Sequence, residues 1–376
     1  MKFYTIEEII VENPRSTLKV NQSMNEGEYI FFTSGIKSKF YNDFLCKGKN
    51  IFIATGGKAN VSFYEGKAAY STDCYSITTK PFVDAKFLFY ILKSKIIEID
   101  KDMFKGAALK HLQKKQFKNI KIKVPVLAEQ QRIVAKLDEA FAKIDKTIQL
   151  TKKKIIEIEQ FSANALTSIY FDKKNKNLKK LNEIVSIKGG KRLPKGKKLT
   201  TENTGFPYIR VKDFNDNGTI NLNSVEFIEA DVQEKIARYT ISSKDVYVSI
   251  AGTIGKTGIV PKILENANLT ENAVKLVPYE GVDKEFLYFF TKTTSFKKQA
   301  INQTRTAAQP KLALERLGKV EIPLFDLKNQ IKIISEARNI ISWMKSTKEN
   351  CYYKIKHLEK LESAILIQKL QIQKAA

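Results

Sequence analysis

The chain has 376 residues, 43% of them hydrophobic, and a formal net charge of +25. This length suffices for two ordinary domains with connecting elements, and no uninterrupted apolar run of about 18 residues occurs, so no membrane span is predicted. The basic excess suits a polyanionic partner, with nucleic acid first and an acidic membrane surface second. Lysines spread over solvated faces explain that excess equally well, so the few arginines are more informative. Among them, Arg15, Arg192, Arg210 and Arg305 lie in the predicted domains, away from the long helices.

Cysteine and histidine usage restricts the chemistry available. The three cysteines are scattered and form no CxxC pair, and the chain has only two histidines. A disulfide framework, a zinc site and a histidine-based triad are therefore not expected, and a reducing cytoplasmic location fits. Glu7 and Glu8 stand where a secretion signal needs an apolar core.

The first predicted domain covers residues 1–127. Aromatic and β-branched runs bounded by glycine and asparagine predict strands at "YIFFTS" (29–34), "NIFIATGG" (50–57) and "AYSTDCYSI" (69–77). A helix is expected around Val83–Ser94, which makes the domain mixed α/β.

A long helix is predicted over residues 128–172, which contain neither glycine nor proline. Leu137, Phe141 and Ile144 begin a series of apolar positions that alternates steps of four and three, the pattern of one helix packing on another. A helix of about 40 residues is about 60 Å long.

The second predicted domain covers residues 173–325, with strands at "PYIRVKDF" (207–214) and "DVYVSIAG" (245–252) and a helix around Val282–Thr293. Its "SIAGTIGKTGIV" (249–260) resembles a phosphate-binding loop at first sight. Only two residues separate Gly252 from Gly255, however, and "GIVPK" predicts a strand where such a loop needs a helix. A β-hairpin is expected instead, with a looser counterpart at "IFIATGGKANVSF" (51–63) in the first domain.

The chain repeats itself with an offset of 200 residues. "VPVLAEQQRIVAKLDEAFAKI" (124–144) aligns without gaps with a segment of a second long helix, predicted over 326–376, and "GAALKHL" (106–112) aligns with "TAAQPKL" (306–312). The predicted order is domain, long helix, domain, long helix. The residues expected to pair the helices or dock partner subunits are Gln130, Arg132, Leu137, Phe141, Ile144, Gln330, Lys332, Ile341, Met344 and Ile355.

These motifs, with "LNEIVSIKGGKRLPKG" (181–196), resemble the specificity subunit of type I restriction–modification systems over essentially the whole chain. The resemblance implies an α+β protein with two mixed α/β target-recognition domains, each binding one half of a split target in double-stranded DNA. It implies two long antiparallel helices that form a coiled-coil spacer, an internal pseudo-two-fold duplication, and docking of two methyltransferase subunits. A motor–nuclease restriction subunit then completes the complex. The subunit itself is expected to be non-catalytic and to need no cofactor, because S-adenosylmethionine, ATP and magnesium belong to its partners. The second helix departs from the pattern at Asn329 and Ile331, where the first has Glu129 and Gln131.

DNA contacts are expected mainly at the two hairpin tips. Lys58 and Lys256 suit phosphates, threonine and asparagine side chains suit base edges or phosphates, and arginines suit guanine. Asp73 and Asn272 occupy matching positions, where they either bind bases or close turns. The candidate DNA-binding residues are Arg15, Ser34, Lys37, Thr55, Lys58, Asn60, Asp73, Lys191, Arg192, Arg210, Lys212, Thr253, Lys256, Thr257, Asn272 and Arg305. No catalytic or metal-binding set is predicted.

Three other functions remain as alternatives. The chain is a specificity module of a different methylation–restriction assembly or a stand-alone DNA-binding modulator, a nucleotide hydrolase acting at Gly255–Thr257, or a structural coiled-coil protein without a DNA role.

Overall fold

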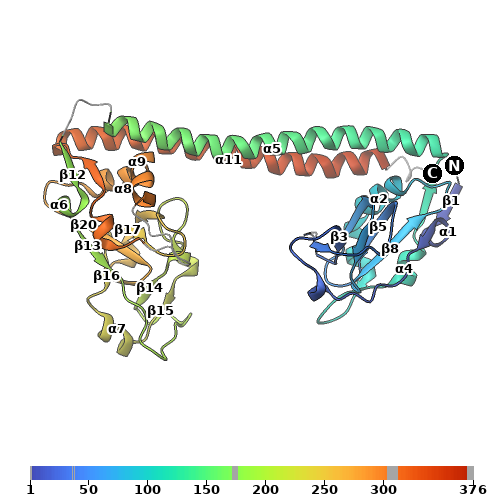
Figure 1. Ribbon diagram of the computed structural model, residues 1–376, viewed down its shortest axis with the longest axis horizontal. Helices are drawn as coiled ribbons and strands as arrows, with labels where there is room; N and C mark the ends of the chain where they lie inside the picture. Colours follow the sequence, from blue (N-terminus) through green and yellow to red (C-terminus); the bar gives the residue numbers. More distant parts are fainter. Residues whose placement is uncertain (1, 36, 38, 172–176, 303–311, 371–376) are drawn as a thin grey trace. The chain divides into compact units, whose positions relative to one another are not determined.

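The computed structural model describes residues 2–35, 37, 39–171, 177–302 and 312–370. The chain divides into two compact units. The first comprises the residues up to Thr151 together with those from Tyr352 onward, and the second is Lys152–Cys351. The units therefore cut across the four consecutive segments expected from the sequence, because each long helix contributes one half to each unit (Figure 1).

The first unit is mixed α/β. Its strands are β1 Lys2–Thr5, β2 Ile10–Glu12, β3 Tyr29–Phe32, β4 Lys39–Tyr41, β5 Lys49–Ala54, β6 Val61–Glu65, β7 Ala68–Tyr70, β8 Cys74–Thr79, β9 Phe104–Lys105, β10 His111–Leu112 and β11 Lys121–Val124. Its helices are α1 Ile6–Ile9, the 3-10 helix η1 Val20–Gln22, α2 Ala85–Ser94, α3 Ile96–Met103, α4 Lys114–Lys118, the first part of α5 Leu127–Phe171 and the last part of α11 Leu327–Leu370.

Two sheets form the body of this unit. An antiparallel sheet has the order β2-β8-β5-β6, and a smaller sheet has the order β4-β3-β7, in which β3 and β7 run parallel. β1 pairs with β11 next to the start of α5. The predicted hairpin at 51–63 is confirmed, since β5 and β6 pair antiparallel from Lys49↔Glu65 to Ile53↔Val61. The buried face of β5 packs with α2, whose N-terminus is capped by the Asp84 carboxylate.

The second unit repeats this plan. Its strands are β12 Leu178–Lys180, β13 Val185–Gly189, β14 Pro207–Ile209, β15 Glu226–Phe227, β16 Thr240–Ile241, β17 Val246–Ser249, β18 Thr257–Ile259, β19 Ala267–Leu269, β20 Ala273–Pro278 and β21 Glu321–Pro323. Its helices are the last part of α5, α6 Leu181–Ile184, α7 Ala230–Ile236, α8 Lys284–Lys292, α9 Thr294–Asn302, α10 Leu314–Leu317, the first part of α11, and the 3-10 turns η2 Val211–Asp213, η3 Leu222–Ser224 and η4 Lys262–Leu264.

The sheet topology confirms the predicted duplication. The order β13-β20-β17-β18 corresponds to β2-β8-β5-β6, and β15-β14-β19-β16 again contains one parallel pair, β14 with β19. β12 pairs with β21 as β1 pairs with β11. The segment 249–260 is a hairpin, because β17 pairs antiparallel with β18 and a strand follows the glycines. This excludes the helix that a phosphate-binding loop requires.

The two long helices confirm the predicted apolar seam. Leu137, Phe141, Ile144 and Ile148 are buried in the first unit, where they join a core that includes Leu366 and Leu370 from the far end of α11. In the second unit, Leu166 and Tyr170 from the end of α5 share a core with Ile333, Ile334 and Ala337 from the start of α11. Each compact unit therefore includes the C-terminal part of the long helix that begins in the other. No helix within the described residues is long and apolar enough to cross a membrane.

Candidate functional site

In the first unit, three backbone hydrogen bonds hold the tip of the β5–β6 hairpin. The Thr55 amide donates to the Asp73 carbonyl at 2.9 Å, and the Leu112 amide donates to the Thr55 carbonyl at 3.0 Å. Gly57, with a φ of +80°, makes the turn, and its amide donates to the Lys110 carbonyl at 2.9 Å. The tip is thereby fixed against the β7–β8 turn and the loop before β10.

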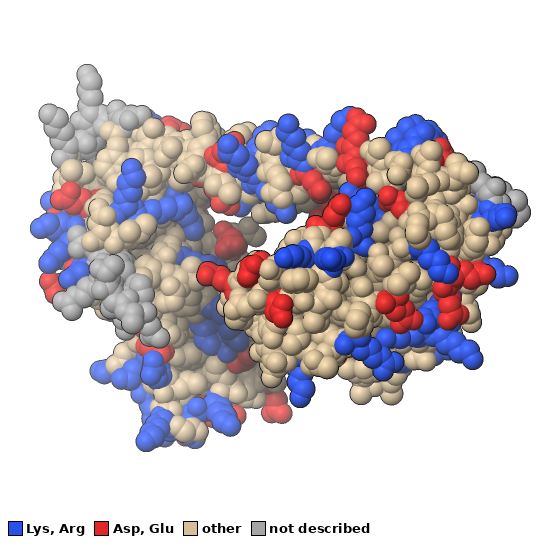
Figure 2. Space-filling view, turned by 45° about the vertical axis from the view of Figure 1, so that its right-hand side comes forward, with Lys and Arg blue, Asp and Glu red and all other residues tan. Residues whose placement is uncertain are grey.

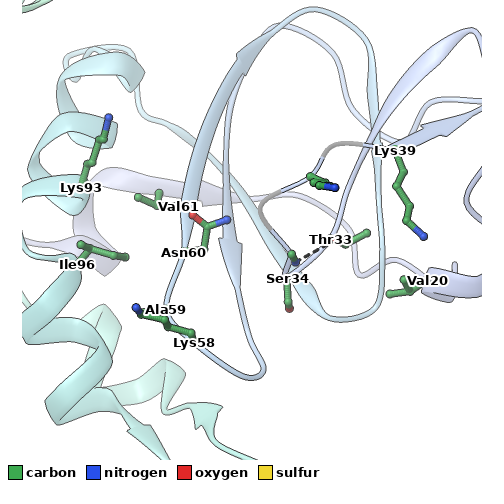
Figure 3. A pocket seen from close by; sticks show the side chains of 12 residues that line it. Val20, Thr33, Ser34, Lys39, Lys58, Ala59, Asn60, Val61, Lys93 and Ile96 are labelled. Atoms are coloured by element: carbon green, nitrogen blue, oxygen red, sulfur yellow. Dashed lines mark hydrogen bonds between the residues drawn. The ribbon is translucent and has the colours of Figure 1, made fainter. Parts of the chain in front are cut away.

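This hairpin borders a basic cavity of about 850 Å³ (Figure 3). Ser34, Lys37, Lys58 and Asn60 line it together with Lys39, which the sequence analysis did not select. The Ser34 hydroxyl donates to the Asp73 carbonyl, so the β3–β4 loop also lies next to the hairpin. Lys37, Lys39 and Lys58 form no ion pair with any described residue, and three uncompensated ammonium groups around one cavity suit a phosphate-rich ligand.

Two other predicted residues of this unit are placed differently. Asp73 is exposed at the β7–β8 turn, where its backbone holds the hairpin. Arg15 is exposed in the loop after β2 and does not line the cavity. Of the candidates in this unit, the structure therefore brings Ser34, Lys37, Lys58 and Asn60 together around one space, with Thr55 at the tip of the same hairpin.

In the second unit, the tip of the β17–β18 hairpin is held in the same way. The Ile250 amide donates to the Asn272 carbonyl at 2.8 Å, and the Leu312 amide donates to the Ile250 carbonyl at 2.9 Å. The tip closes on itself, since Ser249 accepts a hydrogen bond from the Lys256 amide at 2.8 Å through its hydroxyl. Gly252 and Gly255 both have positive φ, +72° and +84°, which this tight loop requires.

The side chains at this tip divide into outward and inward ones. Thr253 is exposed. The Lys256 ammonium lies 3.2 Å from the Asp216 carboxylate and donates to the Phe214 carbonyl at 3.4 Å, so it already has a counter-charge. Thr257 departs from the expectation: it is only 2% exposed, because its hydroxyl accepts a hydrogen bond from Thr291 on α8 at 2.7 Å. We therefore leave Thr257 out of the candidate DNA surface.

Arg192 lies beside the turn that joins β19 and β20. Its side chain is 78% exposed, and its Nε donates to Glu271 Oε1 at 2.6 Å. Burial acts to raise the pKa of Glu271, but the hydrogen bonds from Arg192 and Thr270 outweigh it and leave that pKa lowered. The neighbouring Lys191 is exposed, and its amide donates to the Leu269 carbonyl at 2.8 Å, which ties this loop to the sheet. Asn272 is half-buried in the same turn.

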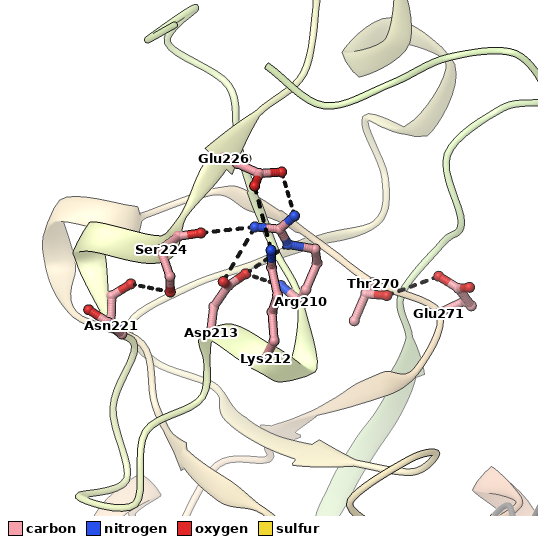
Figure 4. Close-up of polar contacts among 8 residues, drawn as sticks. All are labelled: Arg210, Lys212, Asp213, Asn221, Ser224, Glu226, Thr270 and Glu271. Carbon is pink, nitrogen blue, oxygen red and sulfur yellow. Dashed lines mark hydrogen bonds and ion pairs between the residues drawn. The ribbon is translucent and has the colours of Figure 1, made fainter. Parts of the chain in front are cut away.

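Arg210 is committed to an internal network (Figure 4). Its guanidinium binds the carboxylates of Asp213 and Glu226 and donates to the Ser224 carbonyl at 2.9 Å. Lys212 lies 3.5 Å from the same Glu226, and the hydrogen bond from Arg210 is the main cause that lowers the pKa of Glu226. Arg210 consequently has a structural role here, and we do not retain it as a candidate for reading bases, whereas Lys212 remains exposed.

The predicted helix residues fall into three groups. Leu137, Phe141 and Ile144 are buried and Ile341, Met344 and Ile355 half-buried, as helix pairing requires. Arg132 and Lys332 are exposed at the starts of the two helices. Gln130 and Gln330 are fully buried, so neither side chain is available to a partner subunit.

Two further observations concern metal ligands and surface charge. Within the described part of the chain, no group of three or more His, Cys, Asp or Glu side chains is arranged to hold a metal ion. On the face shown in Figure 2, basic side chains are interspersed with acidic ones, so net charge alone does not mark the interface. Arg305 and most of the "TAAQPKL" segment lie outside the described residues.

Comparisons with known proteins agree with this architecture. Residues 1–160 and 173–350 match the family model of the type I restriction modification DNA specificity domain. The chain is 26% identical over 369 residues to the type I restriction enzyme MjaVIII specificity subunit of Methanocaldococcus jannaschii, covering 88% of this chain and 83% of that protein. It is 22% identical over 363 residues to the EcoBI specificity subunit of Escherichia coli, covering 88% and 76%. A solved chain from work on complex assembly and conformational transition of the type I R-M system shares the fold, with a TM-score of 0.71, 17% identity and coverage of 98% of this chain and 97% of that chain.

Proposed function

Because this chain belongs to the type I restriction–modification DNA specificity family and so recognises the target of such a complex, we propose that its two hairpin tips mark the surfaces that each contact one half of a bipartite DNA site. The observation that carries this proposal is the equivalence of the two tips. Leu112 and Leu312, 200 residues apart, hold corresponding hairpin residues by the same backbone hydrogen bond. The two surfaces have the same backbone arrangement but carry loops of different sequence. This suits the recognition of two half-sites that differ in base sequence.

Within each surface, we assign side chains by the contact that their environment allows. Lys37 and Lys58 at the cavity of the first unit bind phosphates, since they are exposed and carry no counter-charge among the described residues. Arg192 is exposed and held by a single carboxylate, so it is the strongest candidate in the second unit for a base contact. Phosphate contacts set position and affinity, whereas base contacts set sequence choice.

Specificity subunits are non-catalytic, and we propose that methylation and cleavage reside in partners bound to the long helices. Phe161 and Trp343 form an edge-on aromatic pair in the second unit with centroids 5.6 Å apart, and both remain exposed, at 62% and 47%. Exposed aromatic groups of this kind are enriched in protein interfaces. Leu361, which the repeat aligns with Phe161, is also exposed, and this supports two methyltransferase subunits. We propose that a restriction subunit joins this chain and its methyltransferase subunits. The complex would then act on DNA in the cytoplasm.

The proposal is tested by expressing the chain with and without its methyltransferase partner and sequencing the host methylome. Site-specific methylation that appears only when both chains are present, and stable co-purification of the two, is the expected result. Trp343→Lys should reduce co-purification without affecting the folding of the free chain, whereas the same change at exposed Asn339 should not. An unchanged methylome after removal of this chain would overturn the proposal.

A further inference from the structure

A buried glutamine stands in the first turn of each long helix. Gln130 in α5 and Gln330 in α11 are both fully buried, although the residues that follow them, Gln131 and Ile331, are exposed. An uncharged amide buried at equivalent positions in two units needs partners for all its polar atoms.

In the first unit, the Gln130 amide joins the long helix to the recognition domain. Its Oε1 accepts from the Asp84 backbone amide at 2.8 Å, and its Nε2 donates to the carbonyls of Phe82 at 3.0 Å and Pro125 at 2.8 Å. Asp84 is the N-cap of α2, so one side chain connects α5, the loop before it and the start of α2.

The second unit contains the same three bonds. Gln330 Oε1 accepts from the Asp283 backbone amide at 2.8 Å, and Nε2 donates to the carbonyls of Gly281 and Phe325, each at 2.8 Å. Asp283 is the N-cap of α8, the counterpart of α2. The arrangement thus occurs twice on different local sequences.

Eight residues further along each helix, an ion pair provides a second attachment. Asp138 on α5 pairs with Lys86 on α2 at 2.7 Å, and Arg338 on α11 pairs with Glu285 on α8 at 2.7 Å. The signs of the charges are exchanged between the units. Two attachments, two helical turns apart, fix both the position and the direction of the domain helix along its long helix.

The chemistry of the first attachment requires glutamine. The side chain offers one carbonyl acceptor and two N–H donors, and all are used. Glutamate would place a carboxylate against two carbonyl oxygens, and methionine would leave the Asp84 amide and two carbonyls without partners. Glutamate therefore loses the two bonds to the carbonyls and methionine loses all three, although either side chain fills a similar space.

From this duplicated geometry we propose that Gln130 and Gln330 are positioning residues that fix the angle of each recognition domain on its long helix, and thereby set how strictly the complex measures the spacing between half-sites. This inference rests on the proposed bipartite function. The two residues contact no DNA; they act through the orientation of the domains that do.

The test uses the full chain assembled with its methyltransferase partner. Methylation is measured on duplexes that keep both half-sites but carry the native spacer, one base pair fewer, or one base pair more. We expect Gln130→Met and Gln330→Met each to reduce the preference for the native spacer about tenfold, because the three hydrogen bonds that hold the start of the domain helix against the long helix are lost. Preference for each base within the half-sites should not change.

The exposed neighbour Gln131 provides a matched control, since Gln131→Met makes the same change beside the buried amide and should leave spacing preference intact. An equal loss of methylation on all three spacers, or relaxed base choice, would overturn the inference. A wild-type complex without any sequence preference would instead overturn the proposed function. If one variant fails to fold, the inference is tested by the variant in the other unit and by hydrogen exchange of backbone amides in the wild-type chain. The amides of Asp84 and Asp283 should exchange at least about tenfold more slowly than exposed N-cap amides, and fast exchange would contradict the bonds.

Discussion

Lys58→Ala should weaken DNA binding equally for target and non-target duplexes and should flatten its salt dependence. Lys58 is exposed at the β5–β6 tip beside the basic cavity, and no described residue neutralises it. One phosphate contact contributes about 0.9 to the slope of log K against log salt. Between 50 and 200 mM salt, the wild-type complex should therefore lose about three- to fourfold more affinity than the variant.

The corresponding Lys256 should contribute less, because Asp216 already lies 3.2 Å from its ammonium group. Lys256→Ala is expected to change the salt slope by clearly less than Lys58→Ala does. Asp216→Asn should steepen the slope, since it frees the Lys256 charge for phosphate.

The assay is fluorescence anisotropy of the assembled complex on labelled duplexes, titrated at several salt concentrations. Lys146→Ala, on an exposed face of α5 in the first unit, removes the same charge away from the hairpin and is the control. An equal slope change in the control, or a loss by Lys58→Ala confined to the target duplex, would refute the assignment of Lys58 to a phosphate.

Three further predictions concern the second unit. Arg192→Ala should relax choice at a single base pair by about 1–3 kcal/mol, measured by methylation of singly substituted duplexes; a uniform loss over all duplexes would show a phosphate contact instead. Burial lowers the pKa of Lys292 to about 8 from its ordinary 10.5. Between pH 8 and 10.5 the unfolded chain therefore binds more protons than the folded chain, so the free energy of unfolding rises with pH. Lys292→Met should abolish this rise in thermal melts and raise the melting temperature at pH 7. An unchanged pH slope would disprove this explanation. Leu166→Ala removes a side chain that is 1% exposed and should destabilise the second unit by about 2–5 kcal/mol in denaturant unfolding, so a loss below 1 kcal/mol would contradict its place in the core.

Local patterns in the sequence predicted much of the fold. The hairpin at 249–260 followed from glycine spacing and the proline after it, and the long helices followed from the alternating steps that begin at Leu137. The duplication followed from the ungapped alignment, because repeated segments fold into repeated topology.

The partners of individual side chains could not be predicted in this way. From the sequence, Thr257 is expected to be an exposed tip residue. Its burial depends on Thr291, which lies 34 residues later on α8 and packs against it. Arg192 pairs with Glu271, and Arg210 pairs with Glu226. Both ion pairs join different segments, whose conformations depend on tertiary packing. Gln130 belongs to the helix motif, but its burial depends on contacts with the Phe82–Asp84 loop. The periodicity of the helix sequence gives no sign of these contacts.

The first unit contains both ends of the chain, and this has a genetic consequence. A stop codon just after Cys351 removes only the final segment of α11, yet that segment supplies Leu366 and Leu370 to the core around Leu137 and the carboxylate of Glu362 to Lys93. Such a stop codon should damage the first recognition domain, which is encoded at the start of the gene. It should spare the second recognition domain, although that domain is encoded closer to the stop codon. Nonsense and frameshift alleles near the end of this gene should therefore behave as mutations of its beginning.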